Sequence, residues 1–169
     1  MKSTVDIKAL PAATPCLVDA NIFIYHLADL SDECTEFIER VGRYEVQAFI
    51  TTTIIAEVLH RRMMAEALAK KFITSGQPLK KLKANAALIT GLGDYITEVE
   101  KLLRLPFQVI EVTTADISAS HALRLAHGLF VNDSISLACA LRFGISDVIT
   151  HDADFGRVPA IHLWEPTDV

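Results

Sequence analysis

Apolar residues recur along this chain in two spacings, which separate predicted strands from predicted helices. Short apolar runs bounded by turn-forming residues predict buried strands at 16–18, 46–50, 107–112, 147–150 and 161–164. Longer amphipathic or apolar stretches predict helices at 21–27, 32–41, 54–71, 79–103, 114–127 and 133–143. Because strands alternate with helices, we expect an α/β fold, a three-layer α/β/α sandwich around a parallel sheet.

Polar and turn-forming residues mark where several of these helices begin and end. Ser31 is a predicted N-cap, Gly128 is a predicted C-cap, and Asn132 is a predicted N-cap of the last long helix. Gly76 and Pro78 interrupt the long helical stretch in the middle of the chain. The predicted elements are therefore bounded by residues with a physical reason to stop them.

The length of the chain, 169 residues, suits one ordinary domain. Residues 1–15 contain Pro11 and Pro15 among small residues, and they predict an irregular N-terminal lead-in. We expect residues 16–169 to form a single domain. Residues 72–105 are expected to be a helical insertion in that domain.

The formal net charge is −5, which argues against a contact with nucleic acid, because phosphate contacts normally use Lys and Arg. The cations are nevertheless clustered along the chain, at residues 60–62, 70–71 and 80–83. Each cluster can be a solvated helix face or a nucleic-acid contact, and the sequence alone leaves both open.

Three cysteines without a C-x-x-C pair suit a reducing compartment, where free thiols pack as small apolar groups. No apolar stretch approaches the roughly 20 residues of a membrane span. The first residues, which include Lys2, Asp6 and Lys8, lack the uninterrupted apolar core of a signal peptide. We therefore expect a cytoplasmic protein without a membrane segment.

Four acidic residues lie where an open parallel sheet places its sites, beyond the carboxyl ends of the strands. Asp19 immediately follows the first predicted strand, and Glu57 lies early in the helix after the second. Asp133 opens the last long helix, and Asp152 lies just beyond the fourth strand. These residues become neighbours if their strands share one sheet.

Converging carboxylates stay ionised only when a cation compensates their charge. Oxygen ligands favour Mg²⁺ or Mn²⁺ over zinc, and the six histidines are not paired at ligand spacing. Such ions activate water and stabilise the leaving oxygen of a phosphodiester. Acids at strand ends therefore predict a nuclease.

Each acid also has an ordinary structural explanation. Asp19 can end a strand, Glu57 can be a half-exposed helix residue, and Asp133 can be a first-turn residue favoured by the helix dipole. Asp152 and Asp154 can be turn residues. Only their joint placement favours a site.

Four segments, in this order, resemble the motifs of PIN-domain nucleases, the family that includes VapC-type toxins. They are LVDANIF at 17–23, TTIIAEV at 52–58, NDSISLA at 132–138 and ITHDADF at 149–155. The resemblance covers about residues 16–165. It implies that Asp19, Glu57 and Asp133 bind Mg²⁺ or Mn²⁺, that Asp152 is the fourth acid with Asp154 as its competitor, and that Asn21 and Thr150 are supporting polar residues.

The resemblance implies a metal-dependent endoribonuclease that cleaves RNA by metal-activated water, as the toxin of a type II toxin–antitoxin pair. An antitoxin partner and a homodimer are further expectations from the family. Arg61 shares a helix face with Glu57, so it either pairs with that acid or contacts substrate. The alternative function is a non-catalytic PIN-like protein-binding module. A haloacid dehalogenase-type phosphatase fits poorly, because it needs a second Asp where this chain has Asn21.

Overall fold

The centre of the protein is one six-stranded sheet, seen here in a computed structural model that describes residues 5–74, 76 and 78–169. Its strands lie in the order β1-β6-β5-β2-β3-β4, and every pairing among the described residues is parallel. The strands are β1 (Val5–Asp6), β2 (Pro15–Val18), β3 (Gln47–Thr51), β4 (Gln108–Ile110), β5 (Asp147–Ile149) and β6 (His162–Glu165).

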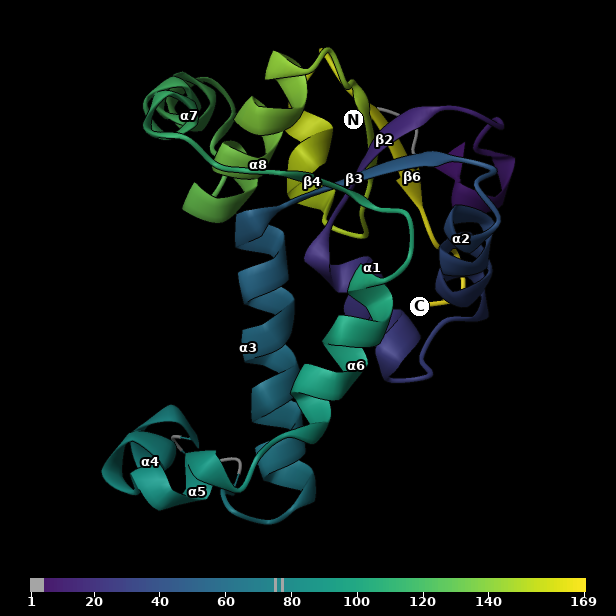
Figure 1. The fold of residues 1–169 in the computed structure, drawn as a ribbon. Coiled ribbons are helices and arrows are strands. Elements are labelled where there is room, and N and C mark those ends of the chain that lie inside the picture. The colour runs from purple at the N-terminus through teal and green to yellow at the C-terminus, as the bar shows by residue number, and fades with distance from the viewer. Residues whose placement is uncertain (1–4, 75, 77) are drawn as a thin grey trace.

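Helices cover both faces of the sheet and complete the predicted three-layer α/β/α fold (Figure 1). On one side, α1 packs against α2 and α3, and α3 packs against α6, while α7 and α8 pair on the other side. The helices are α1 (Ala20–Leu27), α2 (Asp32–Gly42), α3 (Thr52–Ala69), α4 (Pro78–Ala84), α5 (Ala86–Thr90), α6 (Asp94–Leu103), α7 (Thr114–His127) and α8 (Val131–Arg142), with 3-10 turns η1 (Ile7–Ala9) and η2 (Ala153–Arg157).

The central strands are buried on both faces, which explains their continuous apolar runs. Leu17 and Val18 of β2, and Val148 and Ile149 of β5, are all almost fully buried. The strands are apolar up to the point where they end. Polar residues therefore begin at the carboxyl edge of the sheet, where the chain turns into the following helices.

The predicted irregular lead-in over 1–15 is wrong for part of its length. Val5–Asp6 pairs with β6 at the edge of the sheet, and Ile7 and Leu10 are buried in the main core. A two-residue edge strand leaves no periodicity in the sequence, because an alternation needs about four residues. Residues 1–4 of the lead-in lie outside the described residues.

Segments near both ends of the described chain bind to the start of α2. The Lys8 ammonium lies 2.5 Å from a Glu33 carboxylate oxygen, and the Thr167 backbone N–H donates to the other oxygen at 2.6 Å. The Ser31 hydroxyl, which caps α2 as predicted, donates to the Asp168 carboxylate at 2.6 Å. The terminal segments are thus parts of the folded unit.

The helical stretch predicted at 79–103 forms three helices. Asn85 separates α4 from α5, and the segment with Gly91 and Gly93 separates α5 from α6. Val99 and Leu102 of α6 belong to the main core, so α6 is not part of a separate hairpin. We call the described residues between 70 and 93, which include α4 and α5, the arm. The arm lies at the far end of α3, away from the sheet (Figure 1), and packs on a second, small core of Ala67, Ile73, Leu82 and Leu92.

The cap predicted at Asn132 is wrong, whereas Gly128 ends α7 in the left-handed conformation as predicted. Phe130 is the N-cap of α8, and α8 begins at Val131, so Asn132 is already helical. Asp133 consequently lies inside the first turn, where the helix dipole favours a carboxylate.

All three cysteines are buried and free, as their spacing predicts. None of the helices in the described part of the chain is long and apolar enough to cross a membrane.

Candidate active site

Strand order brings the predicted acids to one edge of the sheet. β2 lies between β5 and β3, so the chain leaves three neighbouring strands at the same edge. Val18 pairs with Ile149, and this register places Asp19 beside Thr150. The two residues are far apart in the sequence, and the parallel pairing alone makes them neighbours.

Asp19 is held in one orientation by donors on each carboxylate oxygen. Its Oδ1 accepts the Ala20 backbone N–H at 2.7 Å, which makes Asp19 the N-cap of α1. Its Oδ2 accepts the Thr150 hydroxyl at 2.7 Å and the Asn21 side-chain amide at 2.8 Å. The structure therefore places both predicted supporting residues against Asp19.

Thr150 connects this acid to the next. Its hydroxyl donates to Asp19 and accepts the Asp152 backbone N–H at 3.0 Å. The Asn21 side-chain oxygen accepts the His151 backbone N–H at 3.3 Å. These hydrogen bonds connect the turn after β5 to the turn after β2. They therefore fix where Asp152 lies relative to Asp19.

Glu57 and Asp133 are positioned by a hydroxyl cluster that links α3 to α8. The Thr51 hydroxyl lies 3.0 Å from that of Ser136 and 2.8 Å from that of Thr53, and Thr53 lies 3.2 Å from Ser136. Ser136 is a buried helix serine, one turn after Asp133. The sequence analysis did not predict a role for Thr51 or Thr53. Three consecutive threonines at the end of a strand nevertheless indicate a group of hydroxyls at the sheet edge.

Burial raises the pKa of the Asp19 carboxyl to about 6, and the nearby Glu57 and Asp152 carboxylates add to this increase. Hydrogen bonds from Thr150 and Ala20 oppose it. Burial likewise raises the pKa of Asp133 to about 6, with contributions from the Asp19, Asp152 and Glu57 charges. The four acids thus repel one another, and the site is short of positive charge.

Asp154 differs from Asp152 in its surroundings. The Arg157 guanidinium lies 2.5 Å from Asp154 Oδ1 and compensates its charge. Asp152 caps η2, and its Oδ1 accepts the Asp154 backbone N–H at 2.8 Å. Asp154 is therefore held in an ion pair and contributes to the raised pKa of Asp133, whereas the Asp152 charge raises the pKa of both Asp19 and Asp133.

Arg61 lies one turn after Glu57 on α3, as the sequence predicts. Its guanidinium is 3.6 Å from Glu57 Oε1, and about half of the Arg61 side chain is exposed. An exposed pair at this distance is weak, so Arg61 can leave Glu57 without a large energetic cost.

The PIN domain family model matches residues 16–161 of this chain, which include all four acids and most of the sheet. The chain belongs to the PIN domain family. Its resemblance in four short motifs thus extends to the whole domain, and the three-layer fold agrees with it.

Several known proteins are similar to this PIN domain. The ribonuclease VapC2 of Methanocaldococcus jannaschii is 25% identical over 148 residues, which cover 87% of this chain and 91% of that protein. A VapBC2 structure from Rickettsia felis, bound to a promoter DNA fragment, has a TM-score of 0.59 at 15% identity and covers 90% of this chain and 98% of its own. The sarcin–ricin loop cleaving toxin VapC20 of Mycobacterium tuberculosis has a TM-score of 0.56 at 11% identity, with coverage of 86% and 96%.

The donor set of this PIN domain suits a hard divalent cation, because it consists of carboxylate oxygens at a buried edge. The geometry of these carboxylates matches a cation site only in part. Among the described residues, no three Asp, Glu, His or Cys side chains converge on one point closely enough to hold an ion. The electrostatic coupling of the acids supports a cation there, and their side chains have to approach one another to bind it.

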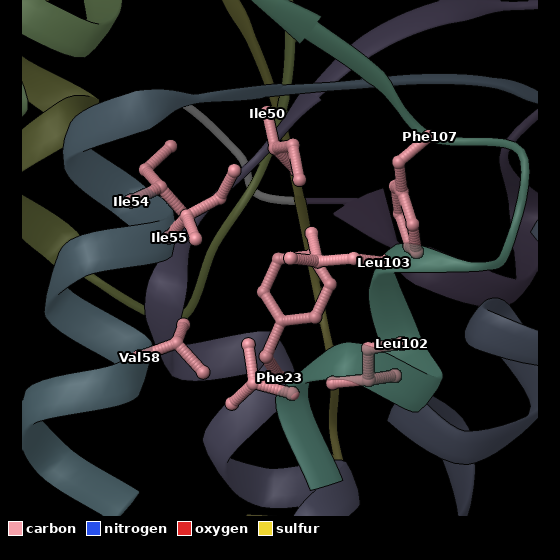
Figure 2. A pocket seen from close by; sticks show the side chains of 9 residues that line it. Phe23, Ile50, Ile54, Ile55, Val58, Leu102, Leu103 and Phe107 are labelled. Atoms are coloured by element: carbon pink, nitrogen blue, oxygen red, sulfur yellow. The ribbon is translucent and has the colours of Figure 1, made fainter. Parts of the chain in front are cut away.

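An apolar pocket lies between α1, α3 and α6, on the helix that carries Glu57 (Figure 2). Figure 2 shows the Phe23 and Phe107 side chains opposite those of α3, and the two rings meet edge to face at 5.2 Å. The pocket holds about 10 Å³, room for no more than about one water molecule. Its lining offers no polar side chain, so it contributes packing and no chemistry to this PIN domain.

Proposed function

We propose that this PIN domain is a metal-dependent endoribonuclease. Asp19, Glu57, Asp133 and Asp152 would together hold Mg²⁺ or Mn²⁺ at the sheet edge. The observation that carries the proposal is the gathering of these acids at one buried sheet edge, where burial, and after it neighbouring carboxylates, raise the pKa of Asp19 and of Asp133, an effect that a bound cation would relieve. When bound, the cation supplies activated water and stabilises the developing charge of a phosphodiester under attack.

The protein's own residues keep this site ready for substrate. Thr150 and Asn21 hold the Asp19 carboxylate in one orientation, so Asp19 is a fixed ligand that the other acids approach when a cation binds. Arg61 lies beside Glu57 in a half-exposed, weak ion pair, so it can exchange its carboxylate partner for a substrate phosphate. We assign it a contact with RNA.

This nuclease is further proposed to be the toxin of a type II toxin–antitoxin pair, with an antitoxin as its partner and a homodimer as its working form in the cytoplasm. The likeness to the VapC2 ribonuclease and to the VapBC2 complex supports this role. A small acidic protein encoded beside this gene should co-purify with the chain and suppress cleavage. An isolated gene without such a neighbour contradicts the toxin role.

The direct test is cleavage of total cellular RNA by the purified chain in Mg²⁺, in Mn²⁺ and in EDTA. Discrete fragments that require metal are expected, with 5′-phosphate and 3′-hydroxyl ends. Ends carrying 2′,3′-cyclic phosphate would instead indicate attack by the ribose hydroxyl and overturn metal-activated water. A folded chain that neither cleaves RNA nor binds Mn²⁺ would favour the non-catalytic protein-binding module.

Metal affinity should depend on pH, because a carboxylate must lose its proton to bind a cation. With Asp19 and Asp133 both titrating at a pKa of about 6, the affinity for Mn²⁺ should fall roughly tenfold or more from pH 7 to pH 5. Isothermal titration calorimetry across this range measures the change. An affinity independent of pH above 5 would show that neither acid binds the ion.

A further inference from the structure

The arm carries a concentration of positive charge that the catalytic proposal does not use. Residues 70–93 contain five lysines and no acidic residue, within a chain of net charge −5. Lys70 is engaged by Glu66 and Asp94. The other four are exposed and have no carboxylate partner in the described part of the chain; they are Lys71, Lys80, Lys81 and Lys83.

Elsewhere in the described chain, most cations have a carboxylate within ion-pair distance. Examples are the pairs Arg40–Glu45, Arg62–Glu98, Arg142–Asp116 and Arg157–Asp154. Unpaired positive charge is therefore concentrated on the arm, away from the acids. A solvated helix face explains the exposure of these lysines but not their separation from the acidic residues of the chain.

The arm is firmly attached to the rest of the protein. The Glu66 carboxylate, almost fully buried, accepts the backbone N–H groups of Gly93 at 3.0 Å and Tyr95 at 2.9 Å, and the Lys70 ammonium at 2.5 Å. These bonds fix the start of α6 against the end of α3. The lysines are consequently presented from a supported surface, where Lys80 and Lys81 border an open hollow.

α3 sets the distance between the lysines and the acids. It begins at the sheet edge, carries Glu57 in its first half and Arg61 near its middle, and ends at the arm (Figure 1). Its 18 residues correspond to a length of about 27 Å. A ligand that reaches both Arg61, beside the acids, and the arm has to be extended, and a phosphate backbone with its regularly spaced negative charges complements such separated cationic contacts.

We propose that the arm is a second RNA-binding surface, which holds the phosphate backbone of the substrate about one α3 length, roughly 27 Å, from the acids. This inference rests on the proposed ribonuclease activity and deepens it. The PIN domain then selects RNA that is long enough to reach both surfaces. Short oligonucleotides contact the acids alone.

The test compares Lys80→Ala/Lys81→Ala with the wild type on oligouridine of two lengths, one shorter than α3 and one several times longer. Binding is measured by fluorescence anisotropy in Mg²⁺ with phosphorothioate-linked oligomers, which resist hydrolysis, so that the acids have a cation available and the RNA stays intact. Affinity for the long oligomer should fall roughly tenfold at low salt. The slope of log affinity against log salt should fall by about 1.4, since each phosphate contact on a single strand contributes about 0.7. Affinity for the short oligomer should not change.

Two further variants separate position from charge. Lys101→Ala/Arg104→Ala removes two exposed cations at the end of α6 that form no ion pair with a described carboxylate, and it should leave the salt slope unchanged. Lys80→Arg/Lys81→Arg keeps the charge and should bind like the wild type. Equal losses in the arm variant and in the α6 variant would overturn the proposal, because general electrostatics would then explain binding.

The results distinguish a wrong proposal about the arm from a wrong proposal about the nuclease activity. Arm-dependent binding without any cleavage supports the arm as an RNA surface and contradicts the proposed function. Metal-dependent cleavage with no effect of the arm variant on long RNA contradicts the arm alone. If the variant binds long RNA normally but loses affinity for an acidic protein partner, the arm is a protein-binding surface and the proposal is wrong.

Discussion

Asp133→Asn should lower metal-dependent RNA cleavage by roughly 10²–10³-fold, the range expected when one preorganised charged group is removed from a site. Asn keeps the shape of the side chain but lacks the charge that holds a divalent cation. Asp133 lies in the first turn of α8, where Ser136 fixes the helix to Thr51. The fold around the substituted residue should therefore be retained.

The same substitution should stabilise the metal-free protein at pH 7. The pKa of Asp133 is about 6 in the folded state, above its ordinary value of 3.8, so the ionised acid destabilises the fold. The destabilisation is absent below pH 4, grows as the pH rises through the interval between 4 and 6, and is complete above it. Asp133→Asn should thus gain about 1–2 kcal/mol at pH 7 and nothing below pH 4.

Chemical denaturation in EDTA and single-turnover cleavage in Mn²⁺ measure both effects. Asp154→Asn is the matched control, because Asp154 is already paired with Arg157 and should keep most of the cleavage activity. Equal losses in the two variants would show that Asp154 also serves the site. Unchanged cleavage by Asp133→Asn would remove the proposed role of Asp133.

Glu66→Gln should lower the free energy of unfolding by about 2 kcal/mol and loosen the arm. Burial raises the pKa of this carboxyl, but the bond from Lys70 and the backbone N–H groups of Tyr95 and Gly93 outweigh it and lower the pKa to about 2. Gln has one acceptor oxygen and turns an N–H₂ group toward these donors. Urea denaturation at pH 7, with the fluorescence of the single tryptophan, Trp164, as the signal, measures the loss.

The pH dependence identifies the cause of this loss. A carboxyl with a lowered pKa stabilises the fold above pH 4.5, and the contribution disappears as the pH falls toward 2. The difference between the wild type and Glu66→Gln should shrink in the same interval. Glu100→Gln, at an exposed position on α6, should change stability by less than about 0.5 kcal/mol. A comparable loss in both variants would contradict the special role of Glu66.

The features that were predictable from the sequence are those set by local pattern and by the general geometry of parallel sheets. β2 and β5 appear as unbroken apolar runs because both of their faces are buried. Asp19 follows one such run and so predicts a site at the sheet edge, whereas the role of Thr150, at the end of the other run, is implied by the resemblance to the PIN family. The parallel register then brings them to hydrogen-bond distance.

What the sequence could not predict depends on contacts between distant segments. The two-residue strand at Val5–Asp6 exists only because β6 offers a free edge. Ser136 meets Thr51 across 85 positions of the chain, and no local pattern marks that contact. The boundary between the arm and α6 depends on the Glu66 carboxylate, which the sequence shows only as one more acid in a helix.

The small separate core of the arm has a consequence for how this protein can diverge. Ala67, Ile73, Leu82 and Leu92 pack among themselves, apart from the residues behind the acids. Changes of length or composition in the arm are therefore absorbed locally, as in surface segments that vary on a constant scaffold. Descendants of such a chain could acquire new substrates by replacing the arm while they inherit the same hydrolytic chemistry.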